Sequence, residues 1–316
     1  MNRSPITPAE LAGVIAVPPL CRQPQAARAP DFVGTARLLR HLADGGITRF
    51  MFGGNAQLFH ITLRDYDALL GFLADQPDDW WMLPACGPAY GRALDQAALL
   101  KRHRFPALML LPCSDPRDAA GMETGLREIH DAAETKLILY LKDETNFGTN
   151  RDAGLAALGH LVADGVCVGI KYAIVRDDPA TDPYLEALLR HVPRERVVSG
   201  MGERPAVVHL RDWRLPGFTT GSGCLAPRLT VQLHAACQRG DWETAERVRQ
   251  RFLALEDLRD AWNPARVLHH AVALAGIADT GPMSPFLSPL ADGQLEQLRP
   301  VARALFHADG DGAAPT

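Results

Sequence analysis

Short apolar runs alternate with amphipathic stretches along most of this chain. Each of eight such runs has the length and composition of a strand buried on both faces. They lie at 12–17, 48–54, 80–86, 106–112, 136–142, 166–171, 196–201 and 216–221. The stretches between them have helical spacing, as at 31–46, where Phe32, Ala36, Leu39 and Leu42 recur and glycines close the end. The alternation predicts repeated βα units around a parallel sheet.

The number of these units indicates how the sheet closes. Eight strands, each followed by a helix, predict a (β/α)₈ TIM barrel over residues 1–240, with its last helix at 226–240. From Asp241 onward the strand pattern stops and helical runs take over. The sequence therefore predicts an α/β barrel with a C-terminal helical extension, residues 241–316, packed on the barrel.

Composition and charge restrict the setting of this barrel. The 316 residues are 47% hydrophobic and 22% charged, with a formal net charge of −4. This balance is typical of a globular protein and offers no basic face for nucleic acid. No apolar run is long enough to cross a bilayer, and the N-terminus lacks a clear signal peptide. We therefore expect a cytoplasmic protein without membrane or nucleic-acid partners.

Lys171 closes the apolar run at 166–171, where an amine has no structural reason to lie. Loss of water favours the neutral form of an amine, and this form attacks a carbonyl carbon. Considered by itself, Lys171 could simply leave the strand and reach solvent. Functional groups of a barrel, however, gather at the C-terminal ends of its strands. The position of Lys171 therefore predicts Schiff-base chemistry.

Other polar or glycine-rich positions fall at predicted strand ends and would share the face that carries Lys171. They are Gly53, Gly54 and Asn55 after the second run, Tyr140 and Lys142 in the fifth, Gly200 after the seventh, and Thr219, Thr220 and Gly221 in the eighth. Because a polar rim of this kind surrounds binding sites more often than it surrounds an isolated lysine, we expect these residues to form one site.

Four motifs carry a resemblance to known enzymes: GGNAQLFHIT (53–62), LILY (137–140), VGIKYA (168–173) and GFTTGSGCLAP (217–227). Together they resemble the dihydrodipicolinate synthase and N-acetylneuraminate lyase family, barrel enzymes that form a Schiff base between a lysine and a 2-oxo acid. The resemblance implies that Lys171 is the Schiff-base lysine and that Tyr140 transfers protons. It also implies a homotetramer built from dimers, with no metal and no organic cofactor.

The segments YLKDETNF (140–147) and GPMSPFLSPL (281–290) are similar to the 5-dehydro-4-deoxyglucarate dehydratase branch of that family. This similarity implies a dehydratase or aldolase that acts on a 3-deoxy-2-oxo sugar acid. The substrate-binding residues would be Gly54 and Asn55 at the carboxylate, Lys142 at distal groups, and Thr219, Thr220 and Gly221 at the last strand.

Several positions depart from the family pattern. Asn55, Ala56 and Gln57 stand where the family has threonine, glycine and glutamate, and Cys113 and Ser114 stand where the synthases have two tyrosines. Two alternatives therefore stay open: a synthase-like condensation of pyruvate, and a degenerate barrel that binds a 2-oxo acid as a sensor or structural subunit. Lys142 is in addition a rival Schiff-base lysine, or a solvated loop residue.

Two other barrel chemistries have less support. A metal-dependent aldolase needs histidines and carboxylates at strand ends, but His60, His130 and His160 fall in predicted helices. A phosphate site would use the glycine-rich stretches 199–205 and 220–223, for which no basic partner is evident in the sequence.

Overall fold

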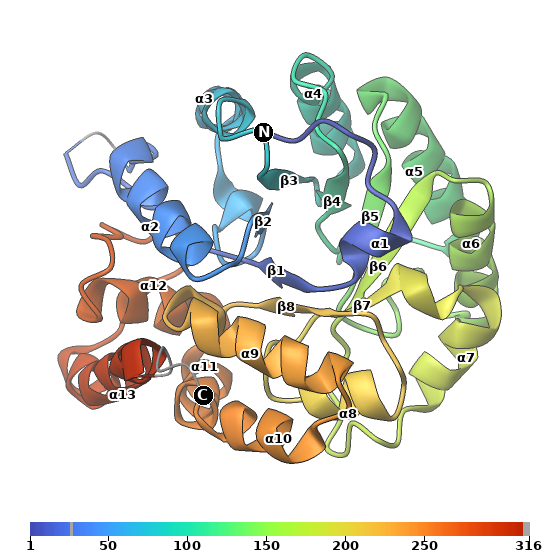
Figure 1. The fold of residues 1–316 in the computed structure, drawn as a ribbon. Helices are drawn as coiled ribbons and strands as arrows, with labels where there is room; N and C mark the ends of the chain where they lie inside the picture. The colour runs from blue at the N-terminus through green and yellow to red at the C-terminus, as the bar shows by residue number, and fades with distance from the viewer. Residues whose placement is uncertain (26–27, 312–316) are drawn as a thin grey trace.

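The computed structural model describes residues 1–25 and 28–311, and its centre is a closed barrel of eight parallel strands in sequence order (Figure 1). The strands are β1 (Val14–Ala16), β2 (Arg49–Phe52), β3 (Trp81–Cys86), β4 (Leu108–Leu110), β5 (Leu137–Leu141), β6 (Cys167–Tyr172), β7 (Val197–Ser199) and β8 (Phe218–Thr220). Each predicted run coincides with one strand, although β6 extends one residue past its run, to Tyr172, so the TIM-barrel prediction is confirmed.

One α-helix follows each strand and covers the outside of the barrel (Figure 1). These helices are α2 (Phe32–Asp44), α3 (Leu63–Ala74), α4 (Tyr90–Leu100), α5 (Ala119–Ala133), α6 (Arg151–Ala163), α7 (Pro183–His191), α8 (Ala206–Arg211) and α9 (Pro227–Gln238), while α1 (Pro8–Leu11) precedes β1. In α2 the Asp31 side chain accepts a hydrogen bond from the Val33 amide, which caps the predicted helix start. The helical spacing then buries Leu38, Leu39 and Leu42 against the barrel.

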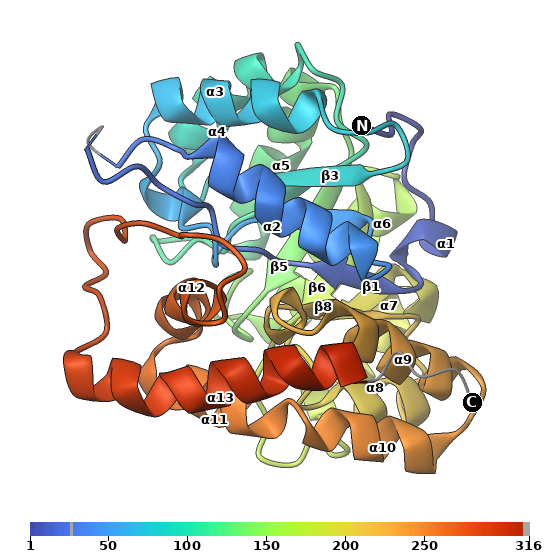
Figure 2. The same ribbon diagram turned by 60° about the vertical axis from the view of Figure 1, so that its left-hand side comes forward.

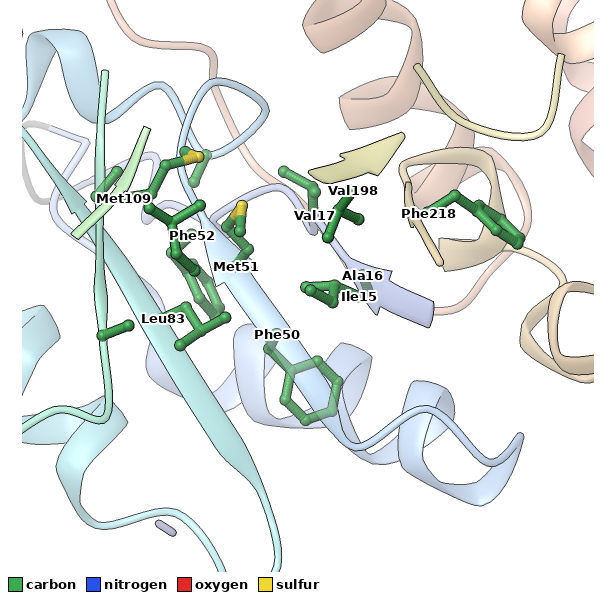
Figure 3. Close-up of a cluster of buried hydrophobic side chains, with 14 of the residues drawn as sticks. Ile15, Ala16, Val17, Phe50, Met51, Phe52, Leu83, Met109, Val198 and Phe218 are labelled. Atoms are coloured by element: carbon green, nitrogen blue, oxygen red, sulfur yellow. The ribbon is translucent and has the colours of Figure 1, made fainter. Parts of the chain in front are cut away.

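The strands are apolar throughout because helices cover one face and the barrel interior covers the other. Figure 3 shows part of this core, in which Phe50 and Phe52 of β2, Leu83 of β3 and Met109 of β4 are completely buried. Gly53, the first residue after β2, packs closely against this core, because a Cβ there would lie 2.3 Å from Cε of Met109. A larger residue at the start of the β2 loop would therefore force the Met109 side chain to move.

Four further helices follow α9: α10 (Trp242–Gln250), α11 (Leu253–Trp262), α12 (Pro264–Leu274) and α13 (Asp292–Asp311). Figure 2 shows α10 and α13 beside α9, with α11 and α12 next to α13. Contacts join α10 to α8 and α9, and α13 to α9, α11 and α12. The helical extension is thus present, whereas its division from the barrel as a separate domain at residue 240 stays a prediction. Across the described chain, every helix is too short or too polar to span a membrane.

Candidate active site

A cavity of about 170 Å³ lies at the C-terminal ends of the barrel strands. It brings together eight of the predicted site residues: Gly54, Asn55, Tyr140, Lys142, Lys171, Gly200, Thr219 and Gly221. They come from the ends of β2, β5, β6, β7 and β8, so closure of the barrel places segments that are distant in sequence around one space. The arrangement has the location expected for the active site of this fold.

Lys171 is 4% exposed and lies next to Tyr140, its direct partner across β5 and β6. Its Nζ is 4.2 Å from the centroid of the Tyr140 ring. Burial, followed by the positive charges of Arg259 and Lys142, lowers the pKa of Lys171 from 10.5 to about 7. A large share of this amine is therefore neutral near pH 7 and able to act as a nucleophile.

Tyr140 supplies the neighbouring hydroxyl. Burial raises the pKa of Tyr140 above its ordinary value of 10, although the charge of Arg259 opposes the rise. The phenol consequently keeps its proton near neutral pH and can donate it.

Lys142 lines the same cavity but is exposed. The Asn146 side-chain oxygen accepts hydrogen bonds from the backbone amides of Lys142 at 2.7 Å and Asp143 at 2.9 Å, which fixes the backbone at the end of β5. The burial that favours a neutral amine at Lys171 is missing at Lys142. The geometry therefore supports Lys171 over Lys142 as the nucleophile.

The loop after β2 is held in place by side chains. Asn55 Nδ2 donates to the Val17 carbonyl at 2.7 Å, which ties the loop to the end of β1. Gln57 is buried and accepts a hydrogen bond from the Ser284 amide at 2.8 Å, and Arg22 donates to the Ala56 carbonyl at 3.2 Å. The loop that would meet a substrate carboxylate is therefore held by hydrogen bonds to residues from the N-terminal and C-terminal parts of the chain.

A short 3₁₀ helix, and not a long α-helix, follows this loop directly. Gln57 adopts a left-handed conformation (φ 57°), and only the three-residue 3₁₀ helix η1 (Leu58–His60) follows it. The helix α3 begins at Leu63, where Thr62 provides the cap. Any anion at Gly54 and Asn55 would thus meet loop amides without the dipole of a long helix.

The two threonines at the end of β8 differ in position. Thr219 lines the cavity, whereas Thr220 is fully buried outside it. The Thr220 hydroxyl donates to Glu203 at 2.5 Å and accepts from the Gly223 amide at 2.7 Å. Thr220 therefore stabilises the turn after β8 instead of facing the cavity.

Three charged residues of α11 also line the cavity: Glu256, Arg259 and Asp260. Arg259 is buried, and its Nη1 donates to Glu256 at 2.6 Å and to Ser222 at 3.1 Å. None of the three was predicted, because a glutamate and an arginine three positions apart on a helix usually form a surface ion pair. No basic partner for the stretch 220–223 was evident in the sequence, and Arg259 of α11 is such a partner.

A second, larger cavity of about 420 Å³ lies beside α4 and α5. Its lining includes Cys113 and Arg117 but no lysine, and Ser114 is exposed outside it. Neither Cys113 nor Ser114 lines the smaller cavity. The smaller cavity is the candidate active site because it alone of the two holds a buried amine. Within residues 1–25 and 28–311, no group of three histidine, cysteine or acidic side chains has the geometry of a metal site.

The chain was compared with known proteins. No family model matches the sequence, and no curated protein sequence matches it. Solved structures do match. Dihydrodipicolinate synthase from Bacillus clausii is 19% identical with a TM-score of 0.76, over 93% of this chain and 97% of that one. YagE from E. coli K12, a prophage protein of the dihydrodipicolinic acid synthase family in complex with pyruvate, is 20% identical with a TM-score of 0.76, over 92% and 98%.

The sialic acid aldolase of Ruminococcus gnavus is 13% identical with a TM-score of 0.80, over 95% of this chain and 99% of that one. Identities at this level establish a common fold and leave the chemistry to be argued from the site. The chain therefore has the fold of the dihydrodipicolinate synthases and of a sialic acid aldolase, along nearly its whole length.

Proposed function

We propose that this protein is a class I lyase of the dihydrodipicolinate synthase and N-acetylneuraminate lyase family, in which Lys171 forms a Schiff base with a 2-oxo acid. The observation that carries the proposal is the buried Lys171 amine beside Tyr140 in a barrel-end cavity. Structural neighbours add support, because they include a sialic acid aldolase and a protein in complex with pyruvate.

The proposed reaction begins when the neutral Lys171 amine attacks carbon 2 of the substrate. The carbinolamine then loses its oxygen as water, with Tyr140 supplying a proton, and an iminium results. The iminium withdraws electrons from carbon 3. In dehydration, carbon 3 loses a proton and the electron pair expels the hydroxyl group of carbon 4, which takes up a proton and leaves as water. In aldol cleavage, the carbon 4 hydroxyl loses its proton, the bond between carbons 3 and 4 breaks, and carbon 4 leaves as an aldehyde while carbon 3 becomes part of the enamine of pyruvate.

The remaining residues of the cavity would bind the substrate. In this proposal the loop at Gly54 and Asn55 holds the carboxylate next to carbon 2, since glycine permits close approach of backbone amides. Thr219 and Gly221 line the cavity at the end of β8, and the exposed Lys142 adds a positive charge to its lining. A 3-deoxy-2-oxo sugar acid fits this distribution of donors, with dehydration preferred over aldol cleavage.

The cellular setting is proposed with the activity. A cytoplasmic homotetramer built from dimers follows from the family resemblance, and sedimentation equilibrium would measure the subunit number. A synthase-like condensation of pyruvate is the alternative reaction on the same iminium.

Reduction with borohydride in the presence of pyruvate, followed by peptide mass mapping, tests the proposal. We expect the label on Lys171 and no label in the Lys171→Met variant. A label on Lys142 would reverse the assignment of the nucleophile, and no labelled lysine would contradict the Schiff-base mechanism. Turnover of a panel of 2-oxo sugar acids then distinguishes pyruvate release from water loss. Adduct formation without turnover of any of them would favour a barrel that only binds a 2-oxo acid.

A further inference from the structure

Arg259 enters the candidate active site from outside the barrel. It lies on α11, one helical turn after Glu256, and is 8% exposed. Its Nη1 donates two hydrogen bonds, to Glu256 at 2.6 Å and to Ser222 at 3.1 Å. In the part of the chain that the structure describes, the Nε atom of Arg259 is buried without a hydrogen-bond partner, and Nη2 makes no hydrogen bond to another protein group. A buried guanidinium therefore has donor capacity left over at the wall of the cavity.

The backbone around Arg259 is shaped to admit the guanidinium. A Cβ on Gly221 would lie 2.4 Å from Nη2, so this nitrogen rests directly on the Gly221 backbone at the cavity wall. Gly202, with φ 72°, leaves similar room for the Glu256 carboxylate, which would be 3.2 Å from a Cβ there. Two glycines at the ends of β7 and β8 thus accommodate one ion pair, and the guanidinium is preorganised in a way that a surface arginine is not.

The ring order of the strands places Arg259 where the far end of a substrate would lie. Lys171 on β6 and Gly54 after β2 stand on opposite sides of the closed barrel, and β8, which ends beside Gly221, stands between them (Figure 1). With the substrate carbonyl at Lys171 and the adjoining carboxylate at Gly54, the rest of the molecule can turn toward Gly221 and Arg259. That end of the cavity is the one that α11 lines.

The charges on the α11 wall are mixed, but those that act on the Lys171 amine are positive. Asp260 lies 3.0 Å from Arg204, and the Glu256 carboxylate is engaged by Arg259 and Ser222. The two neighbouring charges that act on Lys171 are those of Arg259 and Lys142, which also line the cavity. Lys142 is exposed, however, whereas the Arg259 guanidinium is fixed by two hydrogen bonds. A fixed, planar donor pair matches a carboxylate better than a flexible ammonium does.

We propose that Arg259 is the specificity-determining residue of this site, and that Nη2 binds a second carboxylate at the far end of the 2-oxo acid. The inference rests on the proposed function, because it needs the substrate carbonyl to lie at Lys171. It deepens that function by assigning the recognition of the far end of the substrate to a residue outside the barrel.

Borohydride trapping with matched acids tests the proposal. Two pairs differ only in a terminal carboxylate or methyl group: 2-oxoglutarate against 2-oxopentanoate, and 2-oxoadipate against 2-oxohexanoate. In the unmodified protein we expect half-maximal trapping at a concentration roughly 10- to 100-fold lower for at least one diacid than for the matched monocarboxylic acid, the range for a charged hydrogen bond. The Arg259→Gln variant should lose this preference and still trap the monocarboxylic acids.

Two further variants keep the test decisive. Arg259→Lys retains the positive charge next to Glu256 and can be used if Arg259→Gln fails to fold. This variant should lose most of the diacid preference, because a lysine cannot present the planar donor pair. Lys142→Gln should keep most of the preference. The inference is overturned if the unmodified protein shows no preference, if the preference survives in both Arg259 variants, or if Lys142→Gln alone removes it. If no acid labels Lys171, the proposed function itself fails.

Discussion

The Nζ of Lys171 lies 4.2 Å from the centre of the Tyr140 ring, and the two residues are paired across neighbouring strands. A cation over an aromatic ring is attracted to it, which by itself would favour the charged amine. Burial and the nearby charges of Arg259 and Lys142 outweigh this attraction, because the pKa of Lys171 falls to about 7. The same contact places the Tyr140 ring against the amine, and in the proposed mechanism this pair supplies both nucleophile and proton.

Removal of the Tyr140 hydroxyl should separate these two roles. Tyr140→Phe keeps the ring against Lys171, so we expect borohydride trapping of pyruvate to persist. Turnover of the substrate should fall by roughly 10²- to 10⁴-fold, the usual contribution of a positioned proton donor. Steady-state kcat and the trapped fraction measure the two effects in one preparation, and an unchanged kcat would remove Tyr140 from the mechanism.

The burial of Lys171 should be visible in the pH dependence of stability. Its pKa is about 7 in the folded protein and near 10.5 when the chain is unfolded. Between these values the unfolded state binds more protons, so the free energy of unfolding should rise with pH across this window, by about 1.4 kcal/mol per pH unit. Below pH 7 this contribution is constant.

Lys171→Met is the matched control for that measurement, because methionine has a similar length and no charge. Urea denaturation from pH 7 to 10.5 should show the variant to be more stable by a few kcal/mol at pH 7, with the difference shrinking as the pH rises. Parallel curves for the two proteins would mean that Lys171 stays charged when folded.

The neighbouring cations should set the pH at which Lys171 reacts. With saturating pyruvate, the rate of trapping should fall below about pH 7 as the amine becomes protonated. Loss of a nearby positive charge raises the pKa of Lys171, so Arg259→Gln and Lys142→Gln should both move this fall in the trapping rate to higher pH. The shift should be larger for Arg259, whose charge has the greater effect on Lys171. Lys142→Arg keeps the positive charge and should leave the pH at which the rate falls unchanged.

The hydrogen bond between Gln57 and Ser284 should stabilise the loop after β2. Gln57→Ala leaves the buried Ser284 amide without its acceptor, which costs about 1–3 kcal/mol. Urea denaturation measures this loss. Gln57→Glu retains an acceptor oxygen and introduces the residue implied by the family resemblance, so it should be less destabilising than alanine. Equal stability of all three proteins would show that the hydrogen bond contributes nothing.

Gly221→Ala should act on the site through Arg259. The new Cβ would lie 2.4 Å from Nη2, so the guanidinium must move. We expect this variant to weaken the diacid preference as Arg259→Gln does. Gly71→Ala, in the interior of α3 with no atom near its Cβ, is the control and should be neutral or stabilising by about 0.5–1 kcal/mol. An unaltered diacid preference in Gly221→Ala would argue against the close fit.

The barrel was predictable because a strand buried on both faces has a continuous apolar run that is visible locally. Lys171 and Tyr140 stood out because they interrupt or end such runs. The loop after β2 was harder, since the left-handed Gln57 that delays α3 to Leu63 is held by a contact with Ser284, far along the chain.

Local sequence patterns could not identify Arg259 as a residue of the site. Its spacing from Glu256 is the same as in an exposed ion pair, and only the packing of α11 against the turn after β8 turns both residues inward. The sequence contained the clue in Gly221, whose lack of a side chain is required by Arg259, but the partner could be named only from the structure.

The direction in which Arg259 points from α11 affects how the substrate preference of such proteins can change during evolution. Successive residues of an α-helix are rotated by about 100°, so one inserted or deleted residue near the start of α11 would carry the guanidinium away from Gly221. Every residue of the barrel would remain as it is, including the reactive amine. Relatives could therefore exchange one preferred substrate for another through the length of a helix outside the barrel, while the bond-making chemistry is inherited intact.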